Sequence, residues 1–378
     1  MQYRKFGDLN IEVSALGFGA MRLPINGDDS SDIDKEKAVD MIRYAVDNGV
    51  NYIDTAWPYH QGESERLVAE VLKDGYRNKV YLATKLPMWE LEEKSDLDKY
   101  FNKQLEKLEV ETIDFYLLHG LNKKRWKTIE NLDILNWAEE KKNQGKIKYL
   151  GFSFHDSYQV FEKILDSYDW DFCQIQYNYL DTEYQAGRKG LKRAYEKGIG
   201  VIIMEPLRGG WLAQEPPEEV QELFSSQNEE RTPVEWALHW LWSQKEVSLV
   251  LSGMSTMQQV KENLKTADKS EIGYLSKSEF KMMEKASEKM RGPVTCTRCE
   301  YCLPCPEEVN IPQNFHLYNR AKLFDKGEEM SEKYYEMDKK ARADNCIECG
   351  QCEEACPQNL DIIDLLKEVH YFFEQQSR

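Results

Sequence analysis

Four side chains suited to proton transfer stand where short apolar runs of the sequence end. Asp54 closes the run 51–54 and Tyr59 follows in the next loop, while Lys85 and His119 come directly after two later runs. A tyrosine, with a pKa near about 10, is a poor proton donor at neutral pH unless its phenolate is stabilised. A lysine beside it would stabilise the phenolate, and a carboxylate would keep the lysine charged. A histidine could hydrogen-bond a carbonyl oxygen. Each residue alone has an ordinary structural explanation, but together the four predict a catalytic site for proton transfer.

Eight of the nine cysteines form two short runs near the end of the sequence, and Cys173 stands apart. The runs read Cys296-x2-Cys299-x2-Cys302-x2-Cys305-Pro306 and Cys346-x2-Cys349-x2-Cys352-x3-Cys356-Pro357. The second spacing is the one by which cysteines hold [4Fe–4S] clusters, and the first is one residue shorter before its fourth cysteine. Clustering of this kind in an intracellular chain indicates metal ligation rather than disulfides.

The spacing predicts two [4Fe–4S] clusters with crossed ligands. Three thiolates of each run reach one cluster, and the fourth cysteine ligates the other cluster. One cluster would use Cys296, Cys299, Cys302 and Cys356, and the other would use Cys346, Cys349, Cys352 and Cys305. A pair of zinc sites is the alternative, since cysteine sets also bind zinc. A further alternative keeps the clusters but gives them a purely structural role.

The elements that must position the first four side chains alternate between short apolar strands and helical patterns. Strands are expected at 16–23, 51–54, 79–84, 113–118, 147–152, 172–176, 199–203 and 247–251, and helices at 35–48, 63–74, 96–108, 128–143, 157–166, 187–197, 232–243 and 257–267. This order predicts a (β/α)8 TIM barrel, whose strands all end at one mouth. An open, doubly wound sheet is the alternative. Its Gly-x-Gly-x-x-Gly turn is missing, because Gly17-Phe18-Gly19 continues into Ala20-Met21-Arg22.

The cysteine runs belong to a second predicted domain. The breaker Arg291-Gly292-Pro293 separates a barrel over residues 1–290 from a small, mainly α-helical iron–sulfur domain over 291–378. Helical sequence from Gln313 to Ala343 is interrupted at Gly327, and the segment from Leu360 to Phe373 is apolar at helical spacing.

Composition excludes some classes of partner. The net charge of −17 disfavours nucleic acid and anionic membrane surfaces, since both require a basic face. The N-terminus lacks the apolar core of a secretory signal, and no segment has the length of a membrane span. We therefore expect a cytoplasmic protein.

Over residues 1–290 the chain resembles the aldo-keto reductase family. Asp54, Tyr59, Lys85 and His119 match the catalytic tetrad of that family in type, order and strand position. The similarity extends to Gly151-Phe152-Ser153, Gln174-Ile175-Gln176-Tyr177-Asn178, Glu205-Pro206-Leu207, Gly253-Met254-Ser255 and Glu262-Asn263. The resemblance implies a small-molecule carbonyl substrate and a nicotinamide nucleotide lying across the barrel mouth. Trp57 and Trp89 are candidates for the substrate-pocket wall. The second domain resembles an α-helical ferredoxin domain.

The same resemblance implies nucleotide contacts, with some departures from the best-known members. Ser153 and Gln176 should hold the nicotinamide carboxamide, and Ser255, Glu262 and Asn263 should lie along the phosphates and adenosine. Met204 stands where those members stack a tyrosine, and Phe154 follows Ser153 where they have an asparagine. Gly253 and Gln259 stand where they have basic residues for the 2′-phosphate of NADP. Arg208 or Lys261 could replace those basic residues, so NAD and NADP both stay open.

The sequence thus predicts an oxidoreductase that reduces a carbonyl or conjugated carbonyl, with Tyr59 as acid and base. Nicotinamide delivers two electrons as hydride, whereas each cluster carries one. Either a flavin or a partner such as a ferredoxin or flavoprotein splits the pair, or the clusters feed single electrons to the substrate. The alternative is an electron-transfer or binding subunit whose barrel no longer turns over.

Overall fold

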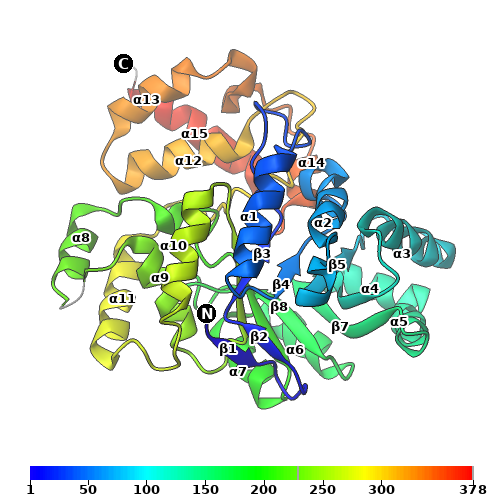
Figure 1. Cartoon of the computed structure of the whole chain (residues 1–378). Coiled ribbons are helices and arrows are strands. Elements are labelled where there is room, and N and C mark those ends of the chain that lie inside the picture. Colours follow the sequence, from blue (N-terminus) through cyan, green and yellow to red (C-terminus); the bar gives the residue numbers. More distant parts are fainter. Residues whose placement is uncertain (228–229, 377–378) are drawn as a thin grey trace. The chain divides into compact units, whose positions relative to one another are not determined.

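The computed structural model describes residues 1–227 and 230–376, and its centre is a closed barrel of parallel strands (Figure 1). The strands follow the order β10-β3-β4-β5-β6-β7-β8-β9. They are β3 (Leu16–Gly19), β4 (Tyr52–Asp54), β5 (Tyr81–Leu86), β6 (Ile113–Leu121), β7 (Ile147–Phe154), β8 (Phe172–Gln176), β9 (Gly200–Met204) and β10 (Leu249–Gly253). Pairing of β10 with β3 closes the ring, with Gly253 opposite Gly19. The predicted (β/α)8 barrel is confirmed, and closure excludes the open sheet.

Helices alternate with these strands, as the sequence pattern predicted. They are α1 (Lys35–Asp47), α2 (Ser64–Leu72), α3 (Lys94–Leu108), α4 (Lys123–Leu132), α5 (Ile134–Asn143), α6 (Tyr158–Asp166), α7 (Gly187–Glu196), α9 (Pro233–Trp242) and α10 (Met257–Ala267). One expectation was wrong. The single helix predicted over 128–143 is two helices, because Asp133 adopts a left-handed φ of 57° that an α-helix does not tolerate.

An aromatic layer fills the barrel end opposite the mouth. The hairpin of β1 (Tyr3–Lys5) and β2 (Glu12–Ser14) leads into this layer, and Phe6 is fully buried there. The Phe115 ring of β6 lies 5.2 Å from the Phe6 ring, 5.0 Å from the Tyr52 ring and 5.0 Å from the Phe172 ring. Edge-on aromatic contacts of this kind stabilise beyond the area that they bury. The layer ties three strands and the hairpin together beneath the mouth.

The described residues form two compact units. One comprises Met1–Pro206 and Glu235–Ser276, and the other comprises Leu207–Val234 and Lys277–Arg378. The second unit therefore includes α8 (Glu218–Ser225) and α11 (Lys277–Lys289), in addition to the sequence after residue 290. The domain boundary at 290–291 stays a prediction.

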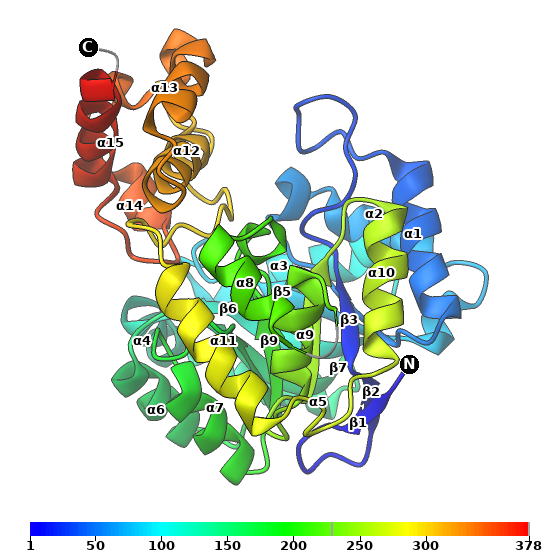
Figure 2. The same cartoon turned by 90° about the vertical axis from the view of Figure 1, so that its left-hand side faces the viewer.

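The C-terminal part of the second unit is helical and has its own core. Its longer helices are α12 (Ile311–Leu323), α13 (Gly327–Glu336) and α15 (Ile362–Gln376), which pack together (Figure 2). The Tyr334 ring of α13 stacks on the Phe373 ring of α15 at 4.6 Å. Most cysteines of the two runs pack against this core, so the helices and the cysteines form one module.

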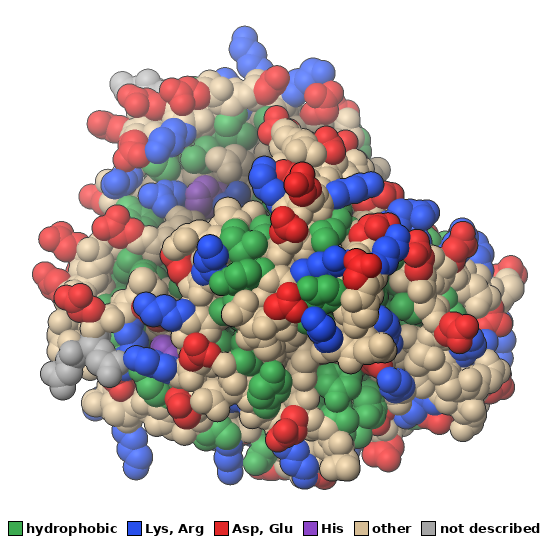
Figure 3. Space-filling model, in the orientation of Figure 1, with side chains coloured by type: hydrophobic (Ala, Val, Ile, Leu, Met, Phe, Trp, Pro, Cys, Tyr) green, Lys and Arg blue, Asp and Glu red, His purple; other side chains and the backbone are tan. Residues whose placement is uncertain are grey.

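Charged residues of both signs lie on the surface of the chain (Figure 3). Figure 3 shows Lys and Arg interspersed with Asp and Glu over one face of the molecule. Among the described residues, no helix combines the length and apolar character needed to cross a membrane.

Replacing Phe115 by alanine should destabilise the barrel by about 3–5 kcal/mol, because it removes a fully buried ring with several aromatic neighbours. Urea unfolding followed by circular dichroism measures this loss. Ile272→Ala is the control, since Ile272 is 59% exposed and should cost no more than about 0.5 kcal/mol. Equal unfolding midpoints for the two variants would contradict the assigned role of the aromatic layer.

Candidate functional site

Three of the four predicted proton-transfer side chains form a hydrogen-bonded chain at the barrel mouth. The Lys85 ammonium donates to Asp54 Oδ2 at 2.7 Å, to the Thr55 carbonyl at 2.9 Å and to the Tyr59 hydroxyl oxygen at 3.2 Å. Strand register explains why they meet, because Asp54 is the last residue of β4 and Lys85 lies near the end of the adjacent β5. Tyr59 begins a short 3₁₀ turn (Tyr59–Gly62) just beyond β4.

Burial sets the electrostatics of this chain. Lys85 is completely buried, and burial lowers the pKa of its ammonium group while Asp54 opposes that shift. Burial likewise raises the pKa of the Asp54 carboxyl group, and Lys85 opposes this shift as well. Breaking such a buried pair leaves an uncompensated charge and costs about 3–5 kcal/mol. The arrangement can thus keep a cation beside the Tyr59 hydroxyl.

His119 lies beside the chain, on β6. Its ring centroid is 6.2 Å from the Tyr59 ring and 5.0 Å from the Trp89 ring. Burial lowers the pKa of His119 well below its usual value, and the charges of Lys85 and Arg125 lower it further. A neutral imidazole has one N–H donor and one acceptor nitrogen, so it can donate a hydrogen bond to a carbonyl oxygen.

The two predicted pocket-wall tryptophans lie differently. Trp89 is 41% exposed and rests near His119, with the Arg125 guanidinium 5.3 Å from its ring. Arg125 also donates to the Gly120 carbonyl at 2.6 Å. Trp57 instead packs edge-on against Tyr100 of α3 at 5.1 Å. Trp89 therefore borders the proton-transfer residues directly, whereas Trp57 anchors the loop of Tyr59 to a helix.

Sequence reasoning missed a second layer of buried polar residues behind Lys85. Glu65 of α2 is fully buried and accepts hydrogen bonds from the Thr84 hydroxyl and the Gln104 amide, both at 2.7 Å. The Gln104 amide also donates to the Lys85 carbonyl at 2.9 Å. The sequence did contain a signal for this layer: Glu65 lies on the apolar face at the start of α2. A buried carboxylate requires hydrogen-bond donors around it.

The predicted nicotinamide contacts lie at the ends of successive strands. Ser153 is near the end of β7, Gln176 ends β8 and Met204 ends β9. The Ser153 hydroxyl accepts from the Gly120 N–H at 2.7 Å, and the Gln176 amide donates to Asp181 at 3.0 Å. These bonds orient both side chains. Met204 is partly exposed and presents an apolar surface there.

The predicted phosphate and adenosine contacts lie where β10 leads into α10. Gly253, Ser255, Gln259 and Glu262 are exposed, while Asn263 is buried and donates to Ser252 at 3.1 Å. The Ser255 hydroxyl donates to the Arg22 carbonyl at 2.8 Å, and the Ser255 N–H donates to Gln259 at 2.8 Å. Exposed polar groups at a strand end fit a nucleotide, but they do not discriminate between NAD and NADP.

One cation near these residues was not predicted. A Cβ on Gly253 would lie 3.3 Å from Arg22 Cβ, so the glycine lets the Arg22 side chain pack over the strand end. Arg22 follows β3, which is far from Gly253 in sequence but pairs with β10 in the barrel. The predicted alternative Lys261 has its ammonium group 5.7 Å from the Tyr44 ring of α1.

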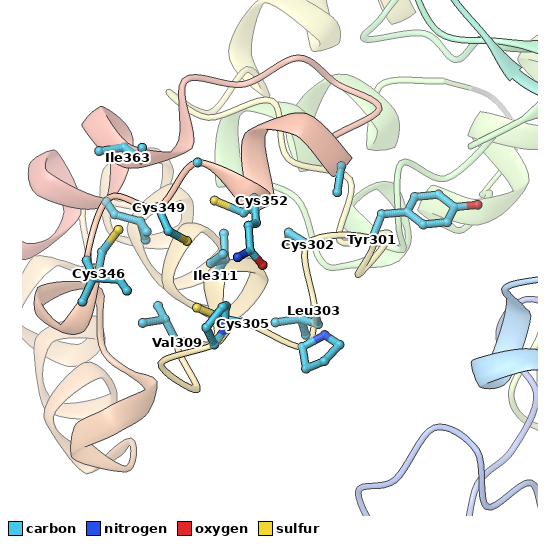
Figure 4. A pocket seen from close by; sticks show the side chains of 17 residues that line it. Tyr301, Cys302, Leu303, Cys305, Val309, Ile311, Cys346, Cys349, Cys352 and Ile363 are labelled. Atoms are coloured by element: carbon cyan, nitrogen blue, oxygen red, sulfur yellow. The ribbon is translucent and has the colours of Figure 1, made fainter. Parts of the chain in front are cut away.

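Cysteines of both runs line a cavity of about 180 Å³ in the second unit. Figure 4 shows Cys346, Cys349 and Cys352 around this cavity, together with Cys305 from the other run. Val309, Ile311 and Ile363 supply apolar walls. Burial, together with the neighbouring Cys346 and Glu353, raises the pKa of the Cys352 thiol to about 11. The crossed set predicted from the spacing is thus gathered in one place, although Cys302 also contributes to the wall.

The remaining thiols gather around Cys302. Burial raises the pKa of the Cys302 thiol, and the neighbouring Cys299, Cys296 and Cys356 raise it further. The Arg298 N–H donates to the Cys296 sulfur at 3.4 Å. Cys356 comes from the second run, so thiols of both runs lie near Cys302.

Thiol-only donor sets in apolar surroundings fit iron–sulfur ligation. A zinc ion would need four thiolates about 2.3 Å from one metal atom. Across residues 1–227 and 230–376, no three or more His, Cys, Asp or Glu side chains are arranged to hold a single metal ion. Cys349 is exposed, and Cys173 is buried on β8, far along the chain from both runs.

Comparison with known proteins identifies the class. The sequence profile of the Aldo/keto reductase family matches residues 15–288, and that of the 4Fe-4S dicluster domain matches residues 295–360. The first match covers more than half of the chain. The protein belongs to the aldo/keto reductase family of oxidoreductases and carries a C-terminal 4Fe-4S dicluster domain.

Individual relatives agree with this assignment over the barrel. The chain is 27% identical to the oxidoreductase YqkF of Bacillus subtilis, over 71% of this chain and 92% of that protein. It is 26% identical to the NADH-specific methylglyoxal reductase of Escherichia coli, over 68% of this chain and 91% of that protein. The solved structure of aldo-keto reductase AKR11C1 from Bacillus halodurans superposes on this chain with a TM-score of 0.63. The two sequences are 28% identical, and the match covers 76% of this chain and 96% of that structure.

We predict that His119 stays neutral from about pH 6 to about pH 8, because burial and two nearby cations disfavour its protonation. Nitrogen-15 NMR of the imidazole groups tests this, with His119→Gln identifying the resonance. The unfolded chain binds a proton at this histidine below about pH 6.5 while the folded chain does not. Acidification through that pH should therefore reduce stability, and less so in His119→Gln. Titration of the His119 resonance near pH 6.5 would contradict the prediction.

Proposed function

We propose that the barrel reduces the carbonyl group of a small molecule with a nicotinamide nucleotide, with Tyr59 as the acid and base. The observation that supports this most directly is the buried chain from Asp54 through Lys85 to the Tyr59 hydroxyl, with spacings of 2.7 Å and 3.2 Å. A conjugated carbonyl is an equally suitable substrate, since the proton again goes to a group polarised by the carbonyl.

The residues divide the work of moving one proton. Tyr59 donates its hydroxyl proton to the carbonyl oxygen as that oxygen gains negative charge. The Lys85 cation stabilises the phenolate that remains, and Asp54 keeps Lys85 charged despite its burial. His119 donates a hydrogen bond to the same oxygen and polarises the carbonyl. A nicotinamide nucleotide, when bound, supplies the hydride.

The residues suited to hold that nucleotide follow the strand ends around the mouth. Ser153 and Gln176 would hold the carboxamide, and Met204 would pack on the ring. Gly253, Ser255, Gln259, Glu262 and Asn263 would lie along the phosphates and adenosine. Arg22 adds a cation at this end through its packing on Gly253. The proposal takes NADH or NADPH as the donor without choosing between them.

The second part of the proposal concerns the cysteines, which would hold two [4Fe–4S] clusters. Cys296, Cys299, Cys302 and Cys356 would hold one, and Cys346, Cys349, Cys352 and Cys305 would hold the other. The crossed gathering of thiols around Cys302 and around the cavity supports this division. Each cluster, when bound, carries one electron.

One-electron clusters beside a two-electron hydride site call for a further component. A flavin or a partner flavoprotein could separate an electron pair, and a ferredoxin could deliver single electrons. Both kinds of partner fit a chain with a dicluster domain, and we include them in the proposal. Mixing the purified chain anaerobically with reduced ferredoxin or flavodoxin, and following cluster absorbance, tests for such a partner.

An electron-transfer or binding subunit is the second candidate. The observation in its favour is that Ser255, a predicted nucleotide contact, is already hydrogen-bonded to Gln259, another predicted contact, and to the Arg22 carbonyl. Under this reading the barrel binds without turnover. A carbonyl-reduction assay with NADH and with NADPH separates the two candidates.

Tyr59→Phe should lower carbonyl turnover by about a hundredfold or more, because it removes the proton donor while keeping the ring. Steady-state kcat with the better nucleotide is the measurement. Tyr195→Phe is the matched control, since Tyr195 is 41% exposed on α7 and should leave kcat unchanged. Near-normal kcat in Tyr59→Phe would show that another group donates the proton.

Anaerobically purified chain should contain about eight iron atoms and eight acid-labile sulfides, from two four-iron clusters. Metal and sulfide analysis with visible absorption measures this content. Cys349→Ser should lower it while Cys173→Ser leaves it unchanged, because Cys173 belongs to neither run. Stoichiometric zinc without sulfide would instead establish the zinc alternative.

A further inference from the structure

Glu65 is a buried carboxylate that the proposed proton transfer does not use. It lies in the first turn of α2, and its side chain has no exposed surface. Helix N-termini favour negative charge, which partly offsets the cost of burying it. The adjacent Ser64 donates to the Ala20 carbonyl at 2.9 Å and bonds the Thr55 hydroxyl at 2.8 Å, so this first turn is fixed against the strand ends.

The partners of Glu65 favour its ionised form. Two donors, the Thr84 hydroxyl and the Gln104 amide, point at Oε1 from 2.7 Å, and the Lys107 ammonium lies 3.5 Å from Oε2. Hydrogen bonds and a cation directed at a carboxylate stabilise its charged state. Burial acts in the opposite direction and raises the pKa of Glu65.

One of these partners reaches the backbone of Lys85. The Gln104 amide that donates to Glu65 also donates to the Lys85 carbonyl at 2.9 Å, and the Gln104 carbonyl oxygen accepts from the Tyr116 hydroxyl at 2.7 Å. Thr84, the other donor, directly precedes Lys85 on β5. Glu65 thus fixes the strand end that carries Lys85 from two sides.

The third partner reaches the loop that carries Tyr59. The Lys107 ammonium donates to the Gly62 carbonyl at 3.0 Å and stands 3.9 Å from the centre of the Trp57 ring. Trp57 and Gly62 lie on the two sides of Tyr59 in sequence. The same carboxylate is therefore linked to both members of the Lys85–Tyr59 hydrogen bond.

We propose that Glu65 is a positioning residue for the Lys85–Tyr59 pair, acting through Gln104 and Thr84 on one side and through Lys107 on the other. The inference rests on the proposed function and names a residue that this function needs. Glu65 would also add negative charge around Lys85, beyond that of Asp54. The charged and titratable groups that face this region are Asp54, Lys85, Lys107, Tyr59, Tyr116 and His119.

Glu65→Gln provides the test, because glutamine keeps the shape and one acceptor oxygen but removes the charge. Loss of a negative charge makes it easier for the Lys85–Tyr59 pair to lose a proton. The ionisation of Tyr59 should therefore move to lower pH by about one unit. Near-ultraviolet absorbance of the phenolate measures it in the full chain. Subtracting the titration of the same variant with Tyr59→Phe isolates this residue among the 21 tyrosines.

Kinetics supply a second readout. We expect kcat of Glu65→Gln to fall about tenfold to a hundredfold with KM for the carbonyl nearly unchanged, because misplacement affects the reacting groups more than binding. The alkaline limb of the kcat profile should move to lower pH with the tyrosine titration. Glu65→Asp, which keeps the charge, should restore the position of the limb.

Glu63→Gln is the matched control. Glu63 stands two residues earlier, is 44% exposed and forms only a loose pair with Arg66 at 3.8 Å, so its charge is screened by solvent. This variant should leave both the titration and kcat unchanged. Thr84→Val is a second test variant that serves if Glu65→Gln fails to fold. It removes one donor from Glu65 but keeps the charge, so we expect kcat to fall by less than in Glu65→Gln, with KM for the carbonyl nearly unchanged.

An unchanged Tyr59 titration in folded Glu65→Gln, or an unchanged kcat in Thr84→Val if the former does not fold, would overturn the proposal. A lower melting temperature with an unmoved titration would overturn it too, because it would assign Glu65 a purely structural role. The titration does not require turnover. A moved titration in a chain that reduces no carbonyl would therefore support the positioning role while refuting the proposed function.

Discussion

The barrel mouth depends on one unfavourable placement, the complete burial of the Lys85 ammonium group. Water cannot reach this charge, so the protein must supply its stabilisation through Asp54, the Thr55 carbonyl and the Tyr59 hydroxyl. The end of β4 provides the first two of these groups, and the neighbouring strand β5 carries Lys85 itself. A cation held in this way lowers the cost of a phenolate at Tyr59, and the proposed acid–base chemistry follows from that.

Around this charge the barrel supplies rigidity in two layers. Below the mouth, the aromatic cluster of Phe6, Tyr52, Phe115 and Phe172 packs the ends of the strands opposite the site. Beside the mouth, the network of Glu65, Thr84 and Gln104 fixes the strand end of Lys85 with hydrogen bonds. Apolar packing thus makes the lower barrel rigid, and hydrogen bonds position the charged residues at the mouth, because hydrogen bonds are directional.

The second unit relies on a different physical principle. Its helices bury a small core in which Phe315, Tyr334 and Phe373 are fully enclosed. Most cysteines of the two runs pack against that core. A core of this size supplies little stability by itself. Ligation of two clusters by thiolates from both runs would cross-link the segments, so cluster binding and folding of this module are expected to be coupled. Under the proposal, the dicluster domain would have a structural as well as an electron-carrying role beside the aldo/keto reductase barrel.

Much of this organisation was determined by the sequence itself. Apolar runs of strand length alternating with helical patterns predicted the barrel, and the positions of Asp54, Lys85 and His119 after such runs predicted a shared mouth, because parallel strands point the same way. Cysteine spacing predicted the crossed thiol sets in the same local manner. Only the tertiary structure decided which distant residues support these groups. Glu65 and Gln104 lie on different helices, and Arg22 reaches Gly253 only because the first and last barrel strands pair. The break of the helix predicted over 128–143 was decided by the left-handed backbone of Asp133, which its sequence neighbours do not require. Local sequence patterns predict where strands end and how metal-ligating cysteines are spaced. Contacts between distant segments depend on how the barrel closes.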